Sequence, residues 1–490
     1  MIIRLRVKGF KNLKEIDISF GAFTCIAGAN AVGKSNLFDA IRFLSATANL
    51  TLTEAAFSIR DSQNEKRSIN DIRNIFYHNG SGYCEKAEFE ADMVIPKTAI
   101  DHLGQIANAK TTFVRYKLEI AYREQTDIAQ SAISVISESL TPIPKREMHR
   151  ALKNIGASSN WINSIQADRK ASTPFISTNL ESAKVEISQD GVAGRKKALS
   201  ISSLPRTVLS TANAVETPTV LVTKKEMESW QLLQLEPSSL RSPDDLIFTE
   251  TPKITTDGKH LPATLYRLIS DKRIQGDVKT SVANRLNRLI DDVFRIEIEK
   301  DDKRDLLTLM IQGRKTPMMP ARSLSDGTLR FLALAVIESD PEMQGVICME
   351  EPENGIHPKR IKAILELLED IAVDITQPGG DDNPLRQVII NTHSPVVVSE
   401  TTEDSLLFAE QIKIPDKNKT EVNVTFRCLK GTWRGDKNTI SKAKILNYLN
   451  PTSPEVDLVD DSSTKKTEEL FARKRVIDRI GIQGKLAFTE

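Results

Sequence analysis

Short apolar runs mark candidate buried strands near the start of the chain and again in its second half. Residues 23–27, 345–349 and 387–391 are short and mainly apolar, which is typical of strands covered on both faces in a parallel sheet. Apolar residues at helical spacing follow the first run, in 37–44, and the longer apolar stretch 330–337 predicts a buried helix. These patterns predict an α/β protein.

Alternation of apolar and polar positions predicts a second kind of strand. Residues 88–95 and 114–120 alternate in this way, as antiparallel strands do when one face of their sheet meets water. We expect them to form an antiparallel side sheet. Residues 123–245 mix small, polar and charged residues with short helical patterns and several prolines, which predicts an inserted, mainly helical subdomain. No heptad pattern is sustained there, so a long coiled coil is not predicted.

Fewer signals follow position 400. The acidic residues in 457–461 lie in a Pro- and Ser-rich linker and lack the spacing of a TOPRIM nuclease, so we expect any nuclease activity to belong to a partner. Residues 465–480 combine a few apolar positions with a basic remainder. This pattern predicts either a helix that docks a partner or DNA, or an ordinary amphipathic helix packed on the body.

Size and charge limit the classes of function. At 490 residues the chain exceeds one simple core, so we expect two or more lobes. Lys and Arg number 67 against 66 for Asp and Glu, a balance that predicts no global attraction to nucleic acid and leaves only local patches, such as 145–146 and 194–197. The four cysteines are far apart without metal-ligand spacing, which suits reduced thiols in a cytoplasm. Neither a signal peptide nor an apolar run of membrane-spanning length is found, so we expect a soluble protein.

The loop after the first apolar run has the composition of a phosphate-binding loop. Gly28, four residues, and then Gly33, Lys34 and Ser35 stand between a strand pattern and a helix pattern. Lys34 would bind the outer phosphates and the Ser35 hydroxyl would ligate Mg²⁺, while backbone N–H groups of the loop would surround the phosphates. A chance glycine turn is the alternative. The residues expected at the nucleotide are Gly28, Ala29, Asn30, Ala31, Val32, Gly33, Lys34, Ser35 and Asn36.

A second candidate for anion binding precedes the long apolar helix. Ser325, Asp326 and Gly327 would lie at the N-terminus of that helix, where free N–H groups and a hydroxyl can bind an anion. On their own these residues are also an ordinary N-cap sequence. The strand patterns downstream are what favour the functional interpretation.

Polar residues follow the two later strand patterns at their C-terminal ends, where ligands bind in open parallel sheets. Glu350 and Glu351 end the first of them, and His393 follows the second. Glu350 would hold Mg²⁺ through water, and Glu351 would activate the attacking water as a general base. His393 is a candidate for a contact with the γ-phosphate, although a lone histidine is more often structural.

The order of these motifs resembles that of ABC-type ATPases, within them the RecF/SMC-like branch. The P-loop, Leu-Ser-Asp-Gly-Thr, Glu-Glu-Pro-Glu-Asn-Gly-Ile-His-Pro and Asn-Thr-His-Ser-Pro carry the resemblance, together with a strand pair at 1–13. Residues 230–241 and 257–265 are similar to segments of bacterial predicted ATPases of the AAA family that occur alone or in anti-phage operons. The resemblance covers 1–95 and 246–400.

The resemblance implies an ABC-type P-loop ATPase head with an antiparallel side sheet and an inserted subdomain. It makes Glu350 the Walker B acid, Glu351 the catalytic base and His393 the switch histidine, with ATP and Mg²⁺ as cofactors. Gln63 would be the metal-contacting glutamine of the Q-loop, although its surroundings form no recognisable motif. Because glutamate replaces the commoner aspartate at Glu350, we expect slow hydrolysis. The implied domains are 1–122, 123–245, 246–400 and a C-terminal extension 401–490.

The resemblance also implies a head-to-head dimer. Ser325 and Gly327 of one subunit would close over ATP on the P-loop of another. Three uses of such a dimer, which could assemble further, remain open. The first is a switch in anti-phage defence, as in the Septu and PARIS ATPases, that controls a separate effector such as a nuclease. The second is a RecF-like DNA-repair ATPase, with DNA as a partner, and the third is a transporter motor, which the unrecognisable Q-loop and the insertion disfavour. Balanced charge and the similar middle segments favour the first.

Overall fold

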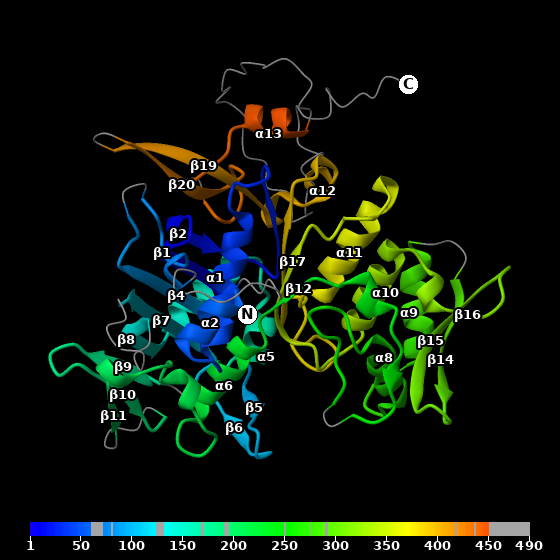
Figure 1. Ribbon diagram of the computed structural model, residues 1–490, viewed down its shortest axis with the longest axis horizontal. Helices are drawn as coiled ribbons and strands as arrows, with labels where there is room; N and C mark the ends of the chain where they lie inside the picture. The colour runs from blue at the N-terminus through cyan, green and yellow to red at the C-terminus, as the bar shows by residue number, and fades with distance from the viewer. Residues whose placement is uncertain are drawn as a thin grey trace.

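A sheet of six strands lies at the centre of the described part of the chain, and β3 in its middle leads into the P-loop (Figure 1). The strands run parallel except β20, which pairs antiparallel to β19. In spatial order they are β12 (Gln231–Leu233), β17 (Gly345–Glu350), β18 (Arg386–Thr392), β3 (Phe23–Ala27), β19 (Leu406–Asp416) and β20 (Lys419–Cys428). This computed structural model describes residues 1–59, 72–79, 82–123, 132–167, 171–190, 196–248, 251–274, 276–289, 293–416, 419–435 and 438–449.

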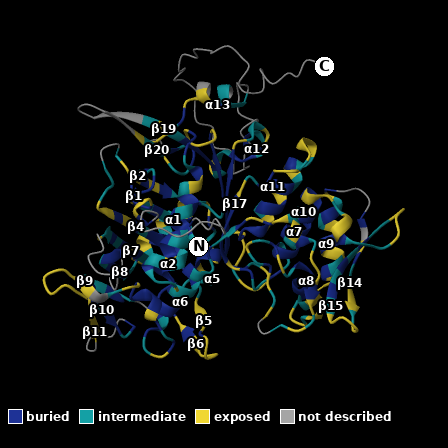
Figure 2. Cartoon of the chain, in the orientation of Figure 1, coloured by how far each residue is buried: buried dark blue, intermediate teal, exposed yellow. Residues whose placement is uncertain are grey.

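Helices cover both faces of this central sheet, which explains why its inner strands are apolar throughout. In β17 the side chain of Val346 packs into the same core as α1 (Lys34–Thr47), while its neighbour Ile347 packs into the core of α10 (Asp326–Glu338). The first five residues of β17 are buried, as the dark blue ribbon in Figure 2 shows. α1 and α10 therefore lie on opposite faces of one sheet.

The alternating patterns form the predicted antiparallel side sheet, which has eight strands in the described residues. Phe89 and Leu118, which are register partners, point into the core that also holds α1. Their neighbours on the other face are charged and form cross-strand ion pairs, such as Lys117 with Glu90. In spatial order the strands are β11 (Lys196–Ser200), β10 (Lys184–Ser188), β9 (Ile176–Asn179), β8 (Ile133–Pro142), β7 (Phe113–Tyr122), β4 (Lys86–Val94), β1 (Ile2–Phe10) and β2 (Leu13–Ser19).

The segment 123–245 contains more strand than its sequence predicts. Short helices are present there, but β8 to β11 extend the side sheet and β12 joins the central sheet, so the segment is not a separate layer of helices. The alternation in β8 is hard to recognise because the strand is rich in serine and buries the carboxylate of Glu138. Its helices are α4 (Lys145–Asn154), α5 (Ser159–Ile165), α6 (Pro218–Glu228) and α7 (Pro237–Leu240).

The central sheet also extends beyond the boundary expected at residue 400. β19 pairs in parallel with β3, so residues 406–416 belong to the central sheet and not to an appended extension. The second lobe, residues 234–343, packs around α10 and includes a smaller sheet. Its strands are β13 (Asp244–Asp245), β15 (Leu306–Gly313), β14 (Val293–Asp301) and β16 (Met319–Pro320). The remaining elements are α2 (Leu52–Ser58), β5 (Thr98–Ile100), β6 (Ile106–Asn108), α8 (Leu261–Ser270), α9 (Val278–Asn287), α11 (Ile361–Ile371), α12 (Pro395–Glu400) and α13 (Lys442–Leu449). Within the described ranges, no helix has both the length and the apolar character needed to cross a membrane.

Candidate nucleotide-binding site

Three parallel strands deliver the candidate site residues to one edge of the central sheet. β3 ends at Ala27 before the P-loop, β17 ends at Glu350, and β18 ends at Thr392. Glu350 is the register partner of Asn391, and Thr392 is the partner of Ala27, so the three ends are level. The carboxyl edge of a parallel sheet is where ligands bind in this class of fold.

The two glycines of the P-loop are required by close packing. A Cβ atom at Gly33 would lie 2.1 Å from Nδ2 of Asn12, and one at Gly28 would lie 2.7 Å from the carbonyl oxygen of Ala409. Gly33 also has a φ of 109°, which residues with a side chain rarely adopt. A loop of this kind, followed by a helix N-terminus, fits a phosphate group because its N–H groups converge.

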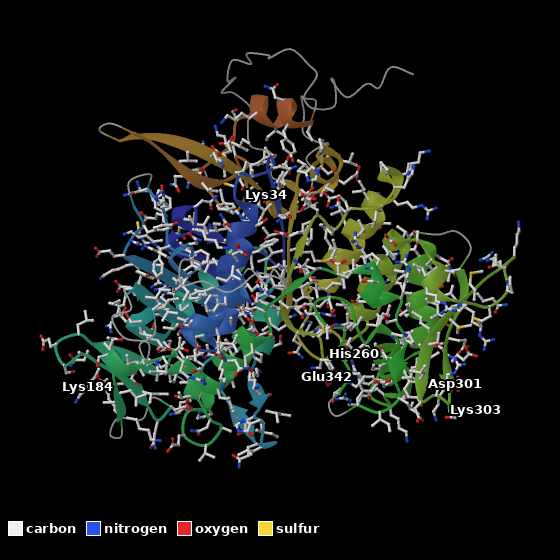
Figure 3. All side chains as sticks on the ribbon, in the orientation of Figure 1. Lys34, Lys184, His260, Asp301, Lys303 and Glu342 are labelled. Carbon is white, nitrogen blue, oxygen red and sulfur yellow. The ribbon has the colours of Figure 1, made fainter. Side chains whose placement is uncertain are left out.

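Lys34 begins α1 and folds back over the loop. Its ammonium donates to the carbonyl oxygens of Gly28, at 2.5 Å, and Ala29, at 2.9 Å, and the residue is only 6% exposed. Burial lowers the pKa of Lys34, while Glu351 and Glu350 oppose that shift. Figure 3 shows Lys34 at the end of α1 that faces away from β5 and β6.

Hydrogen bonds from residues outside the loop fix its backbone, and most of its other residues are exposed to solvent. The Asn12 amide donates to the carbonyl of Val32, at 3.4 Å, and Gln411 of β19 donates to the carbonyl of Ala31, at 3.0 Å. Ala31 has a φ of 63°. A nucleotide could reach the exposed residues of the loop, which are Ala29, Asn30, Ala31 and Ser35. The N–H of Asn36 donates to the carbonyl oxygen of Gly33.

Glu351 is the centre of a small hydrogen-bonded group. One carboxylate oxygen lies 2.6 Å from Nδ1 of His393, and the other accepts from the amide of Asn354 at 2.9 Å. Asn391 supports both acids, because its side-chain amide donates to Glu350 and its two oxygens accept the Glu351 N–H. The predicted acids and histidine are therefore brought together beside Lys34.

The environment of Glu351 keeps it charged. Its partial burial would raise the pKa, but the hydrogen bonds from Asn354 and His393 and the charge of Lys34 lower it, with a net shift downward. Glu351 also has a φ of 46°, an unusual value for a residue with a side chain. The downward shift leaves the carboxylate free to accept a proton from water, but it also makes Glu351 a weaker base.

Ser325, Asp326 and Gly327 are placed elsewhere. Ser325 caps α10, since its hydroxyl accepts from the Thr328 N–H at 3.3 Å, and α10 lies on the face of the sheet opposite α1. Gly327 packs against the loop after Glu351, where a Cβ would lie 2.4 Å from the Gly355 carbonyl oxygen. Gly327 thus contacts the loop that follows Glu351 in its own chain through Gly355.

Sequence reasoning missed Asn391 and Asn354, which orient the two acids. The available signal was their position: Asn354 follows Glu351 by three residues, and Asn391 is the last but one residue of a strand that ends at the site. The candidate Gln63 lies outside the residues that the structure describes.

A search of solved structures returns SMC head domains, with TM-scores below 0.5. "Crystal structure of the SmcHead bound to the C-winged helix domain of ScpA" has 14% identity and a TM-score of 0.45, and the match covers 86% of this chain and 97% of the other. "SMC head domain from Thermotoga maritima" has 11% identity and a TM-score of 0.37, with 88% and 99% covered. An Smc head domain from Pyrococcus furiosus, bound to the C-terminal domain of ScpA, has 11% identity and a TM-score of 0.41, with 86% and 96% covered.

Comparison at the level of sequence gives a more decisive result. No curated protein matches the chain significantly. One family model matches residues 23–113 and 151–399, which include the P-loop, the signature residues, both acids and His393. This match confirms the expectation of a nucleotide-binding P-loop domain of the AAA family. Because the match covers well over half of the chain, the protein belongs to the family described as "AAA domain, putative AbiEii toxin, Type IV TA system".

Proposed function

We propose that this protein binds ATP and hydrolyses it slowly, and that nucleotide binding drives two chains into a head-to-head dimer that controls a separate effector. One observation carries the proposal. Lys34, Glu350 and Glu351 meet at one edge of the central sheet, whereas Ser325 and the rest of the signature lie on the helix across that sheet. A second chain can supply the missing signature to this half-site.

The chemistry assigned to each residue follows from its contacts. Lys34 exchanges its bonds to the Gly28 and Ala29 carbonyls for phosphate oxygens. Ser35 and Glu350 would hold Mg²⁺, which when bound neutralises phosphate charge. Glu351 takes a proton from the attacking water, and its contact with His393 keeps the carboxylate oriented.

The dimer is a switch only if ATP binds the closed form better than the open form. Moving a population from mostly open to mostly closed requires roughly 5 kcal/mol of differential affinity. Two triphosphates, each contacted from both chains, are a suitable source of that difference. Hydrolysis removes the bridging γ-phosphate, so slow turnover sets how long the closed state lasts.

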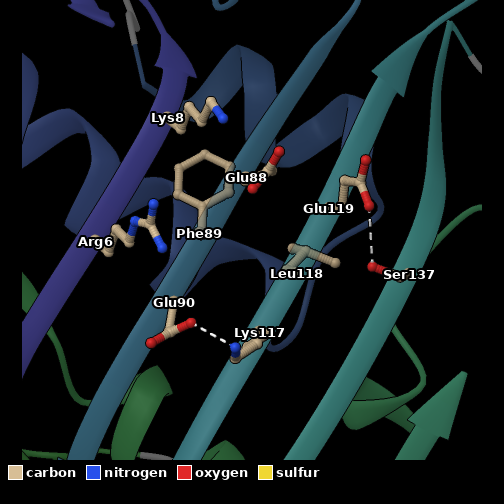
Figure 4. A pocket seen from close by; sticks show the side chains of 9 residues that line it. All are labelled: Arg6, Lys8, Glu88, Phe89, Glu90, Lys117, Leu118, Glu119 and Ser137. Atoms are coloured by element: carbon tan, nitrogen blue, oxygen red, sulfur yellow. Dashed lines mark hydrogen bonds and ion pairs between the residues drawn. The ribbon is translucent and has the colours of Figure 1, made fainter. Parts of the chain in front are cut away.

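The family description names a toxin of a toxin–antitoxin system, which is consistent with control of a toxic effector in defence against phage. A RecF-like role on DNA is the second candidate, and the charges on the surface do not favour it. The pocket on the open face of the side sheet is lined by three cations and three carboxylates, and Lys117 pairs with Glu90 at 2.6 Å (Figure 4). The basic pair Lys196 and Lys197 is likewise neutralised by carboxylates within 2.8 Å.

The proposal is tested with three purified chains: wild type, Lys34→Ala and Glu351→Gln. We expect Glu351→Gln to be a dimer in ATP and a monomer without it in light scattering, because it binds nucleotide but cannot hydrolyse it. Lys34→Ala should stay monomeric and fail to bind ATP. A Glu351→Gln chain that binds ATP and remains monomeric would contradict the switch. In cells that carry the neighbouring genes, both variants should lose protection against phage, and an unchanged plaque count would remove the defence role.

A further inference from the structure

Two segments that the sequence singled out, 230–241 and 257–265, pack against each other in the second lobe. The Gln234 N–H donates to the Thr256 carbonyl and the Glu236 N–H donates to the Asp257 carbonyl, each at 2.8 Å. Ser239 adds a bond from its hydroxyl to the Asp257 carboxylate. The first segment therefore has a fixed position on the second, next to the signature helix.

The short helix α7 at the end of the first segment is locked in place by its last residue. Leu240 is 2% exposed, and its side chain occupies the space that a Cβ at Gly258 would need, at 2.8 Å. Gly258 has a φ of 93°, so both its backbone and its lack of a side chain serve this contact. The backbone of Arg241, the next residue, is therefore held in a fixed position.

The Arg241 side chain bridges both sides of the signature residue Ser325. Its Nε donates to the Arg322 carbonyl at 3.2 Å, and one terminal nitrogen donates to the Leu324 carbonyl at 3.1 Å and to the Asp326 carboxylate at 2.5 Å. A planar guanidinium donates from separate nitrogens in fixed directions, whereas a lysine donates from one nitrogen only. These bonds hold the turn that presents the Ser325 hydroxyl.

The charge of Arg241 has a second consequence. Asp326 lies between Ser325 and Gly327, the two residues proposed to meet the triphosphate, so its carboxylate would repel the phosphates. The ion pair with Arg241 compensates this charge and holds the carboxylate to one side.

We propose that Arg241 is a positioning residue for the composite ATP site: it prepares the signature loop of its own chain to bind the triphosphate held by another chain. This inference rests on the proposed function. Arg241 should therefore act across the dimer, and its loss should leave the P-loop of its own chain intact.

The first measurements use single variants. Arg241→Ala should bind a fluorescent ATP analogue within about twofold of wild type, since its P-loop is unchanged, yet its ATP-dependent dimerisation in the Glu351→Gln background should weaken at least about tenfold. Arg241→Lys should remain defective because two separate guanidinium nitrogens serve these acceptors, whereas lysine donates from a single nitrogen. Arg304→Ala, which removes an arginine that is 78% exposed in the same lobe, is the matched control and should dimerise normally.

A mixing experiment then decides how Arg241 acts. Lys34→Ala chains should be inactive and Arg241→Ala chains impaired. Their mixed dimer contains one site with an intact P-loop and an intact signature loop, so ATP turnover should rise above that of either chain alone. Lys34→Ala mixed with Ser325→Arg is the reference pair and should recover in the same way. If only the reference pair recovers, the assignment of Arg241 is wrong and the composite site stands. If the reference pair also stays inactive although Ser325→Arg binds ATP, the composite site itself is wrong.

Discussion

Replacing Gly33 by alanine should destabilise the P-loop in two ways, by straining its backbone and by creating a steric collision. The backbone has a φ of 109°, and holding a residue with a Cβ in a left-handed conformation costs roughly 1–2 kcal/mol. The new methyl group would also collide with the Asn12 amide, which is 2.1 Å away. Because that amide can swing aside at the loss of its bond to the Val32 carbonyl, we assign about 1 kcal/mol to the collision. The expected total is therefore roughly 2–3 kcal/mol.

Native-state hydrogen exchange of the amides in α1 measures this loss as a lower free energy of local opening. In a double-mutant cycle, Asn12→Ala should restore about 1 kcal/mol to Gly33→Ala and leave the backbone cost. Gly28→Ala is the contrasting case, since its Cβ would lie 2.7 Å from the backbone oxygen of Ala409 and 3.3 Å from its Cβ, so Ala409→Gly removes only the longer contact and should restore little of the loss. Full recovery of Gly33→Ala by Asn12→Ala, or a loss below about 0.5 kcal/mol in Gly33→Ala itself, would refute this division of the cost.

Three further changes test other parts of the molecule. Gly327→Ala should weaken ATP-dependent dimerisation in light scattering, because a Cβ 2.4 Å from the Gly355 backbone oxygen must displace the start of α10; unchanged dimerisation would contradict this close contact. Asn354→Ala should raise the pKa of Glu351 by removing a hydrogen bond to its carboxylate, so the acid limb of the pH profile of ATP turnover should move to higher pH. An unchanged profile would show that Asn354 does not lower the pKa of Glu351. Burial raises the pKa of Glu138 from 4.5 to about 7, so its contribution to the free energy of unfolding is largest below pH 4.5 and is lost as the pH rises through 7. Glu138→Gln should therefore flatten the melting temperature between these pH values. An equally steep pH profile would argue against the shift.

The elements with strong periodicity could be predicted from the sequence because local pattern alone determines them. The runs at 23–27, 345–349 and 387–391 became β3, β17 and β18, and the apolar stretch at 330–337 lies within α10. The carboxyl ends of the three strands then meet by the geometry of a parallel sheet, so the grouping of Lys34 with the two acids followed as well.

What escaped prediction depends on contacts between residues distant in sequence. The bonds of Arg241 to the signature loop join positions 81 to 85 residues apart, and no periodicity indicates such a partner. β8 was missed for a different reason: Glu138 is buried in it and bonds the N–H groups of Val208 and Leu209, so a charged residue occupies a core position. The role of Gln63 remains a prediction.

The position of β3 in the central sheet has a consequence for synthesis of the chain on the ribosome. β3 pairs with β18 and β19, so about 360 further residues must be translated after β3 before the first of these partners leaves the ribosome. At 5–20 residues per second this delay is roughly 20–70 s, during which the five residues of β3, all buried in the folded protein, have no native sheet to join. The nascent chain should therefore depend on chaperones more than its final stability suggests, and the proposed nucleotide site should be among the last parts of the molecule to form.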